Sequence, residues 1–254
     1  MSLLVDHENR VLHLTLNRPN KRNALNTEMC AKIVEAIASA QNDQNVGSIL
    51  MSAAGQSFCA GMDLDEAVKS SDTELAEIHE KLFTVGVNSL KPIVLCVNGP
   101  ALGGGLGLVA QGHAIVAAEG AVFGLTEMRL GLWPFLVYRA VEAALGARRT
   151  LELSLTTRVF STHDALQWGL VHYVFPPSDA ADNAAAIARD LAKASSLAIS
   201  AGMQYVRESR GKSWEEAGEL AAALRRKLMD SADFKEGCAA FKEKREPRWP
   251  SLYS

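Results

Sequence analysis

Three consecutive glycines, residues 103–105, are the first feature of this sequence that could do chemistry. They follow a short apolar run, residues 92–97, and precede a run without proline, so they predict a turn from a buried strand into a helix. Glycines at such a turn leave main-chain N–H groups bare at the positive end of a helix, where an anion or a developing oxyanion can bind. Close packing of a helix on a strand would explain the same glycines, so the turn needs partners before it indicates catalysis.

A second small-residue turn, residues 53–64, has the same place between a strand and a helix. Each of the two turns can offer one free N–H group at a helix start. Two such groups that converge on one carbonyl oxygen form an oxyanion hole, in which loss of one donor raises the barrier by roughly 3–4 kcal/mol. The spacing alone leaves open whether the two turns meet.

Glu127 is the third feature, because it is a carboxylate in apolar surroundings. The apolar residues around it are Phe123, Leu125, Met128, Leu130, Leu132 and Trp133. Such surroundings raise the pKa of a carboxyl group and suit it to move a proton near neutral pH. A helix cap, or a surface pair with Arg129, would explain the same residue.

The elements that must position these residues alternate in the first half of the chain. Strands are predicted at residues 11–16, 46–52, 92–97, 113–118 and 121–123, and helices from residue 27 onward and at residues 72–90. Beyond residue 134 helices are predicted at residues 139–146, 150–155, 163–168, 178–194, 197–209, 214–229 and 232–244, with one strand at residues 170–175 and an irregular end. This order predicts an α/β fold, with one domain and a helical appendage rather than two equal domains.

The composition narrows the class of protein. The chain has 254 residues, of which 48% are hydrophobic and 22% charged, and a net charge of −3, which argues against broad nucleic-acid binding. Its four cysteines are widely spaced and fit reduced thiols. We find no secretory h-region and no apolar run of membrane-spanning length, so we expect a cytoplasmic protein without nucleic-acid or membrane partners.

Five segments in order resemble the signatures of the enoyl-CoA hydratase/isomerase (crotonase) superfamily. They are residues 17–25, 58–64, 98–108, 123–134 and 241–245. The resemblance covers nearly the whole chain. It implies a crotonase-type spiral of ββα units at residues 1–195 that holds an acyl-CoA site. It also implies a C-terminal helical region, residues 196–254, that builds a homotrimer, often paired into a dimer of trimers.

The same resemblance implies roles for individual residues. The thioester carbonyl of an acyl-CoA would lie between the N–H groups of Met62 and Gly104, with Glu127 as the acid and base. The remaining substrate-binding candidates are Lys21, Arg22, Ala24, Ala60, Gly61, Asp63, Leu64, Gly103 and Trp133, together with Phe241 and Lys244 from a neighbouring subunit. The main-chain carbonyls near Ala60 and Leu64 would accept from the adenine amino group. We expect no metal and no separate cofactor, because coenzyme A is part of the substrate.

The sequence departs from the hydratases at Gly107, where they carry a second glutamate. Hydration needs one group to orient water and another to handle the proton, whereas moving a double bond needs one carboxylate that takes a proton at C2 and returns it at C4. The bulky residues after Glu127 also resemble those of the isomerases, with Trp133 and Phe135 expected to keep the acyl pocket dry. We therefore expect enoyl-CoA Δ3–Δ2 isomerisation in fatty-acid metabolism.

Several alternatives remain open. A hydratase could recruit Asp63 or an ordered water in place of the missing glutamate. A hydrolase could use Ser57 or Cys59, although the G-x-S-x-G elbow is incomplete and the H-E-x-x-H zinc motif fails after His79. The chain could also be an acyl-CoA-binding oligomer without catalytic activity.

Overall fold

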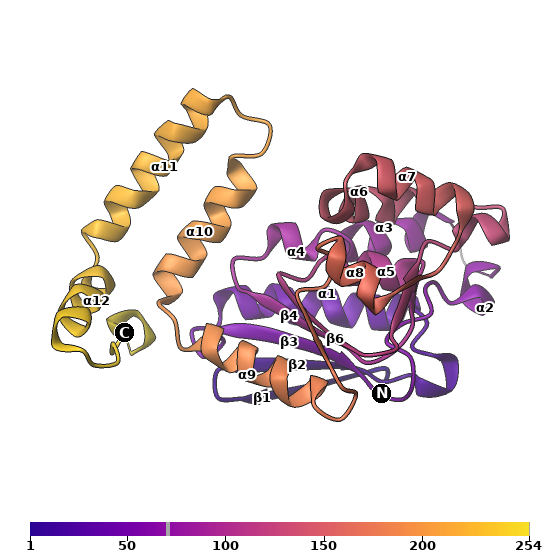
Figure 1. Ribbon diagram of the computed structural model, residues 1–254, viewed down its shortest axis with the longest axis horizontal. Coiled ribbons are helices and arrows are strands. Elements are labelled where there is room, and N and C mark those ends of the chain that lie inside the picture. The colour runs from indigo at the N-terminus through magenta and orange to yellow at the C-terminus, as the bar shows by residue number, and fades with distance from the viewer. Residues whose placement is uncertain (70–71, 254) are drawn as a thin grey trace.

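A six-stranded sheet forms the centre of the fold in the computed structural model, which describes residues 1–69 and 72–253 (Figure 1). In spatial order its strands are β1 (Leu3–Glu8), β2 (Val11–Leu16), β3 (Ser48–Ala53), β4 (Ile93–Val97), β6 (Ala114–Ala118) and β9 (Tyr173–Phe175). The β1–β2 pair is antiparallel and the other pairs are parallel. Parallel strands bring their carboxyl ends to one edge, which is where ligand sites of such sheets form.

A second, smaller sheet lies beyond this edge. It consists of β5 (Ala101–Leu102), β7 (Val122–Gly124) and β8 (Phe160–Ser161). The chain passes from a strand of the large sheet to a short strand of the small one and then into a helix, as in β4, β5 and α5 (Gly104–Val109). This recurring unit makes the crotonase-type spiral that the sequence predicts.

The helices on one face of the large sheet enclose the main core. They are α1 (Thr27–Asn42), α3 (Asp72–Leu82), α4 (Val85–Asn88), α5, α6 (Phe135–Leu145), α7 (Ala147–Thr156) and α8 (Thr162–Gln167). The short helix α2 (Leu64–Ala67) lies at the periphery and buries no residue. Helix α1 begins at a cap in which the side chain of Asn26 accepts from the N–H of Met29, and its buried stripe includes Ile33 and Ile37.

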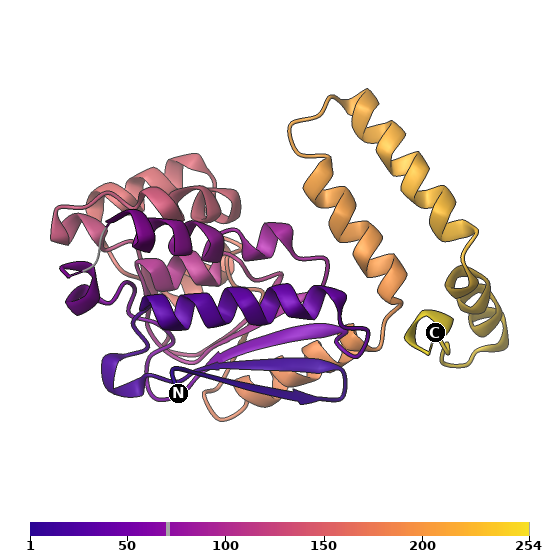
Figure 2. The same cartoon turned by 180° about the vertical axis from the view of Figure 1, so that it is seen from behind.

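Helix α9 (Ala180–Ala192) covers the opposite face of the sheet (Figure 2). Its buried residues are alanines at every fourth position, Ala180, Ala184, Ala188 and Ala192. They pack on a small apolar cluster that includes Leu50, Val94 and Val116. Alanine brings the helix backbone close to the sheet, so this second core layer is thin.

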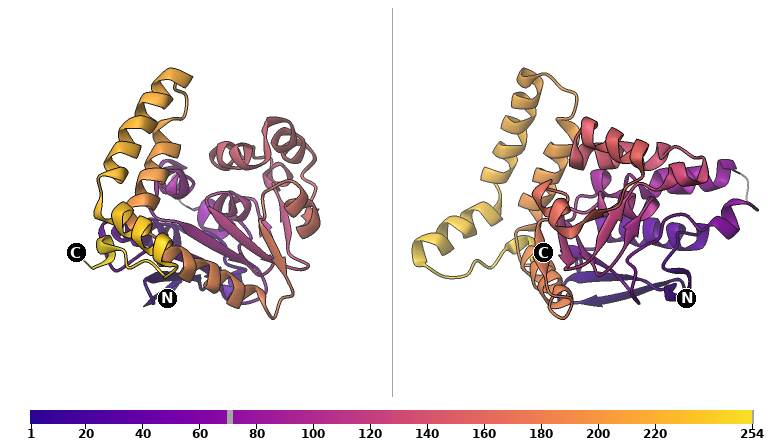
Figure 3. Two further views of the ribbon diagram at one scale, coloured as in Figure 1. Left: turned by 60° about the vertical axis from the view of Figure 1, so that its left-hand side comes forward. Right: turned by 45° about the vertical axis from the view of Figure 1, so that its right-hand side comes forward.

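Three helices, α10 (Ser196–Glu208), α11 (Trp214–Met229) and α12 (Ala232–Glu243), form an arm that projects away from the sheet (Figures 1 and 3). Asp233 is only 2% exposed and ties the arm together. Its carboxylate accepts from the hydroxyl of Ser195 at 2.5 Å and from the hydroxyl of Ser251 at 2.6 Å. The start of α10 and the C-terminal turn are thereby fixed to α12.

The element predictions need several corrections, and the short strands β5 and β8 of the small sheet were not predicted. Strand β1 was not predicted, because only Leu3 of its six residues is buried and the pattern carries no alternation. The predicted helix at residues 72–90 is two helices, α3 and α4. Helix α6 begins at residue 135 rather than 139, and β9 spans only residues 173–175. Within the part of the chain that is described, no helix is both long and apolar enough to cross a bilayer.

Candidate active site

The two glycine-containing turns lie side by side. Residue Cys59 forms a parallel bridge with Ala101, and the N–H of Leu102 donates to the carbonyl of Cys59 at 3.0 Å. A Cβ atom added to Gly61 would lie 3.4 Å from the nitrogen of Gly104. The turn that follows residue 59 and the turn that follows residue 102 therefore leave the small sheet as neighbours.

Both turns present main-chain N–H groups for which the described residues supply no acceptor. The N–H of Gly103 donates to the carbonyl of Gly124 at 2.8 Å, and the N–H of Gly61 points to Sγ of Cys59 at 3.5 Å. The N–H groups of Met62 and Gly104, in contrast, have no hydrogen-bond acceptor among the described residues. Gly61 and Gly103 have φ angles of 96° and 54°, which glycine adopts without strain. The backbone conformations of Gly61 and Gly103 thus leave the N–H groups of Met62 and Gly104 available to a ligand.

The N-terminal loop, residues 17–26 between β2 and α1, holds the turn at residues 60–64 in place. The N–H of Leu25 donates to the carbonyl of Gly61 at 2.7 Å, and the N–H of Asp63 donates to the carbonyl of Leu25 at 2.9 Å. The guanidinium of Arg18 donates to the carboxylate of Asp63 at 2.7 Å and also to the carbonyl of Ala24. The ion pair and main-chain bonds fix the orientation of the Met62 amide between them.

Glu127 lies across from these donors, where β7 runs through Thr126 into a short 3₁₀ helix, Glu127–Leu130. A Cβ atom on Gly103 would lie 3.3 Å from its Oε1, so the carboxyl group borders the second turn. Its Oε2 is buried and has no hydrogen-bond partner within the described residues. Burial raises the pKa of the Glu127 carboxyl. Arg129 does not pair with it, because the Arg129 guanidinium donates to Thr157.

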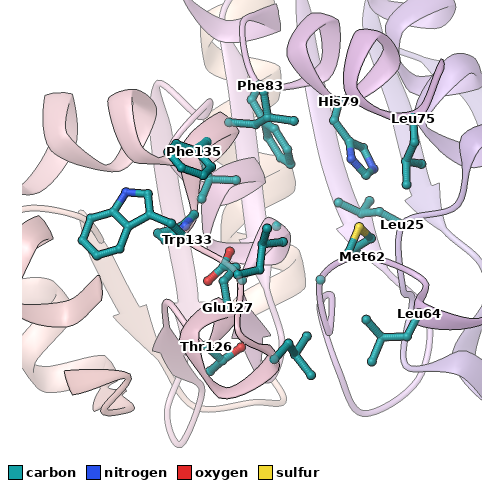
Figure 4. Close-up of a pocket in the computed structure, with 18 of the residues that line it drawn as sticks. Leu25, Met62, Leu64, Leu75, His79, Phe83, Thr126, Glu127, Trp133 and Phe135 are labelled. Atoms are coloured by element: carbon teal, nitrogen blue, oxygen red, sulfur yellow. The ribbon is translucent and has the colours of Figure 1, made fainter. Parts of the chain in front are cut away.

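A cavity of about 460 Å³ joins the two turns and Glu127 (Figure 4). Its walls are mainly apolar and include Leu25, Leu75, Phe83, Leu132, Phe135 and Val137. The stacked pair Trp133 and Tyr138, with ring centroids 6.0 Å apart, supports the wall beside Glu127. Phe135 is 72% exposed and stands at the rim rather than inside. The cavity can take an apolar chain with one polar head at the two N–H groups.

Eight of the predicted site residues line this cavity. They are Ala60, Gly61, Met62, Leu64, Gly103, Gly104, Glu127 and Trp133. Three residues without a role in the predicted site, His79, Phe83 and Thr126, line it as well. The apolar spacing of residues 72–90 predicted a helix but not which of its residues face a cavity.

The other predicted residues lie outside the cavity. Lys21, Arg22 and Ala24 belong to the N-terminal loop, where the carbonyl of Arg22 accepts from the N–H of Ala60. Lys21 forms an exposed ion pair with Asp65 at 2.7 Å. Asp63 is engaged with Arg18 and caps α2. Two further residues, Phe241 on α12 and Lys244 just after it, lie on the arm, away from the cavity of their own chain (Figures 1 and 2).

The position of the missing glutamate has no room for a side chain. A Cβ atom on Gly107 would lie 2.4 Å from Cγ1 of Val137 and 3.1 Å from the ring of Phe83. Real Cβ atoms do not come this close to neighbours, so Val137 on α6 occupies the space that a second carboxylate would need.

Cys59 lacks the properties of a nucleophile although it adjoins the free N–H groups. Its side chain is fully buried, and burial raises the pKa of its thiol to about 12. A nucleophilic cysteine needs a depressed pKa and a base that takes its proton. The Cys59 thiol instead receives the N–H of Gly61 and so contributes to the shape of the turn.

Comparison with known proteins agrees with this fold. The family model described as enoyl-CoA hydratase/isomerase matches residues 6–251. The chain is 33% identical to the 2,3-dehydroadipyl-CoA hydratase of Escherichia coli, over 96% of this chain and 97% of that protein. It is 30% identical to the 1,2-epoxyphenylacetyl-CoA isomerase of the same organism, over 98% of each. The crystal structure of an enoyl-CoA hydratase from Mycobacterium smegmatis superposes with a TM-score of 0.92 at 28% identity, over 98% of this chain and 99% of that one.

Taken together, the spiral α/β fold and the family match define an enzyme of the crotonase superfamily. The chain belongs to the enoyl-CoA hydratase/isomerase family.

Proposed function

We propose that this enzyme moves the double bond of an enoyl-CoA thioester from position 3 to position 2. The observation that carries the proposal is the carboxylate of Glu127, the only one that the described residues bring to the cavity lined by Met62 and Gly104, whose N–H groups have no acceptor among them. The crowded position at Gly107 supports it, because a second acid for hydration has no space there.

The reaction needs one proton carrier and one charge-stabilising site. The thioester oxygen accepts from the N–H groups of Met62 and Gly104. The Glu127 carboxylate removes a proton from C2, and the electron pair of that C–H bond moves into the thioester to form an enolate conjugated with the double bond. The same carboxyl then returns its proton at C4, and the double bond ends between C2 and C3. The two fixed amides stabilise the negative charge on the oxygen as it develops.

The surroundings of Glu127 suit this cycle. Burial raises the pKa of its carboxyl, which makes the carboxylate a stronger base than a carboxylate in water. The apolar walls keep water away from the intermediate and strengthen the hydrogen bonds at the oxygen.

Coenzyme A would extend from the cavity along the N-terminal loop. We propose that the main-chain carbonyls near Ala60 and Leu64 receive the adenine amino group and that Lys21 and Arg22 face the phosphates. Lys244 and Phe241 lie on the arm, so they would reach the same coenzyme only from another subunit. Helices that meet in a trimer would bring them there.

The direct test replaces Glu127 by glutamine and follows the formation of the conjugated thioester from 3-enoyl-CoA by its absorbance. We expect turnover to fall by at least about 100-fold, since general acid–base catalysis contributes on the order of 10²–10⁴, while the Kd for the product thioester stays nearly unchanged. Met62→Ala, which keeps the main-chain amide, is the control and should be mild by comparison. Undiminished turnover of Glu127→Gln would refute the proposal.

Hydration is the second candidate, because a relative that is 33% identical is named a hydratase. An activated water held by Glu127 alone would add across the conjugated double bond. Crotonyl-CoA distinguishes the two reactions: rapid loss of its conjugated absorbance favours the hydratase, and a stable signal together with conversion of 3-enoyl-CoA favours the isomerase.

A further inference from the structure

His79 is a buried polar residue in the acyl cavity that the proposed reaction does not use. It projects from α3, is 6% exposed and lines the cavity between Leu75 and Phe83. Its Nε2 is buried and has no hydrogen-bond partner among the described residues. Buried polar atoms in folded proteins are nearly always paired, so the partner of this one lies beyond the described side chains, and a ligand in the cavity can supply it.

The imidazole stands apart from the site of proton transfer. In Figure 4 it lies on the wall of α3 with Leu75, across the cavity from Glu127 and Thr126. The rings of His79 and Phe83 are 5.8 Å apart, which holds the imidazole in this wall. A substrate atom that meets Nε2 therefore belongs to the acyl chain and not to the carbons that exchange protons at Glu127.

The protonation state of the His79 imidazole limits the chemical class of the group that can pair with it. Burial lowers the pKa of His79, so its ring is neutral at physiological pH and offers one donor and one acceptor. A carboxylate would have to give up its hydration in this mainly apolar cavity, which is costly. An uncharged hydroxyl group loses less, and it can donate to a bare ring nitrogen or accept from a ring N–H group. A hydrocarbon chain would displace water from the cavity and leave Nε2 unpaired.

We infer that the acyl group of the substrate carries an uncharged oxygen substituent, a hydroxyl or an oxo group, which hydrogen-bonds to Nε2 of His79. This inference rests on the proposed function for the position of the thioester between Met62 and Gly104. His79 is on this view the residue that selects oxygenated over plain acyl chains, and it takes no part in the proton transfer.

The first experiment measures binding, so that its result does not depend on catalysis. Saturated acyl-CoA thioesters of one length, unsubstituted or with a hydroxyl or oxo group at each carbon of the chain beyond C4 in turn, are titrated into the full-length protein by calorimetry. We expect at least one oxygenated thioester to bind about tenfold or more tightly than its hydrocarbon parent, because a site built to hydrogen-bond a substrate disfavours the analogue that lacks the group. Equal affinity across the series would overturn the inference, whether or not the protein isomerises 3-enoyl-CoA.

The second experiment assigns the preference to His79. His79→Leu should remove it by weakening the oxygenated thioester and not the hydrocarbon one, and His79→Gln, whose amide can reach the place of Nε2, should keep part of it. His163→Leu, which removes an exposed imidazole from α8, is the matched control and should leave the preference intact. A preference that survives in His79→Leu would refute the role of His79. Where wild type turns over 3-enoyl thioesters, the same preference is expected in kcat/KM.

Discussion

At the scale of single residues, the burial of Glu127 that suits the proposed proton transfer also lowers the stability of the folded protein. One of its carboxyl oxygens is buried without a partner, and ionisation adds a charge to that poorly solvated place. Residues held in this way are found where catalysis requires a shifted pKa. The same argument makes stability a readout of the site that is independent of substrate.

Glu127→Gln should therefore raise the free energy of unfolding at pH 8 by about 1 kcal/mol, the usual scale for an unpaired buried polar group. The folded-state pKa lies above the ordinary value of 4.5, so between the two values the folded protein binds the proton more tightly than the unfolded chain. The stability of the wild type then falls as pH rises through this window, and the variant lacks that part of the fall.

Urea unfolding of both proteins between pH 5 and pH 8 checks this prediction. The gain should be smallest at the acid end and largest at the alkaline end. A variant that loses stability to the same extent at every pH would show that the carboxyl group is not held in an unfavourable environment.

At the scale of elements, helices α5 and α6 meet so closely that Gly107 admits no side chain. Val137 and Phe83 contact the place of its Cβ. Helix packing therefore limits which side chain position 107 can carry. A glutamate there would require α6 to move or a smaller residue to replace Val137.

Gly107→Ala should destabilise the protein by about 1–3 kcal/mol, the usual cost of overpacking, although alanine favours a helix. Val137→Ala in the same chain should recover much of this loss, so that the two changes couple strongly in a double-mutant cycle. Gly218→Ala on α11, where nothing lies near the added Cβ, is the control and should gain up to about 1 kcal/mol. Additive effects of the first pair would contradict the contact.

The loop that carries Arg18 is the second element on which the site depends. The Arg18–Asp63 side chains are 19% and 8% exposed, which makes this a buried ion pair beside the Met62 amide. Arg18→Met should cost about 3 kcal/mol of stability, since it leaves the Asp63 charge without its partner. It should also lower kcat more than it raises KM, because the turn that carries Met62 loses its anchor.

The exposed pair Arg158–Glu152 offers the control, with side chains 43% and 41% exposed. Arg158→Met should change stability by less than about 1 kcal/mol and leave kcat unchanged. Equal effects of the two substitutions on unfolding and on turnover would mean that the Arg18–Asp63 pair does not hold the turn.

At the scale of the whole molecule, the arm exposes apolar surface that an isolated chain would leave in water. Trp214 is 96% exposed, Phe241 86% and Phe234 44%. A groove between α10 and α11 is lined by small and apolar residues, including Ala201, Tyr205 and Leu224. Surfaces of this kind mark protein interfaces, and a trimer or a dimer of trimers remains our prediction for this chain.

Light scattering after size exclusion should give the mass of three or six chains for the wild type. Asp233→Ala should reduce that mass at low protein concentration, because it removes the acceptor that joins Ser195 and Ser251 to α12 and so loosens the arm. Ser178→Ala, on the surface before α9, is the control. An unchanged mass for Asp233→Ala at every concentration would show that the arm does not depend on this carboxylate.

The sequence by itself determined the local features of this protein. The alternation of strands and helices, the two small-residue turns and the apolar setting of Glu127 are encoded within a few neighbouring residues. The structure contains all three features and differs from the prediction at the ends of elements and in short strands that were missed. The signature segments identified the family for the same reason, since each is short and continuous. The absence of the second glutamate of the hydratases is likewise visible at a single position, Gly107.

Only the tertiary structure decided how these pieces meet. Residues 61 and 104 lie side by side because β3 and β4 are parallel neighbours, a pairing between distant segments that no local pattern specifies. The crowding of Gly107 by Val137, and the lack of a partner for Nε2 of His79 among the described residues, depend on the packing of α3, α5 and α6. Long-range packing decides which polar atoms are left without partners. For this reason the cavity, unlike the candidate carboxylate of Glu127, could not be derived from the sequence.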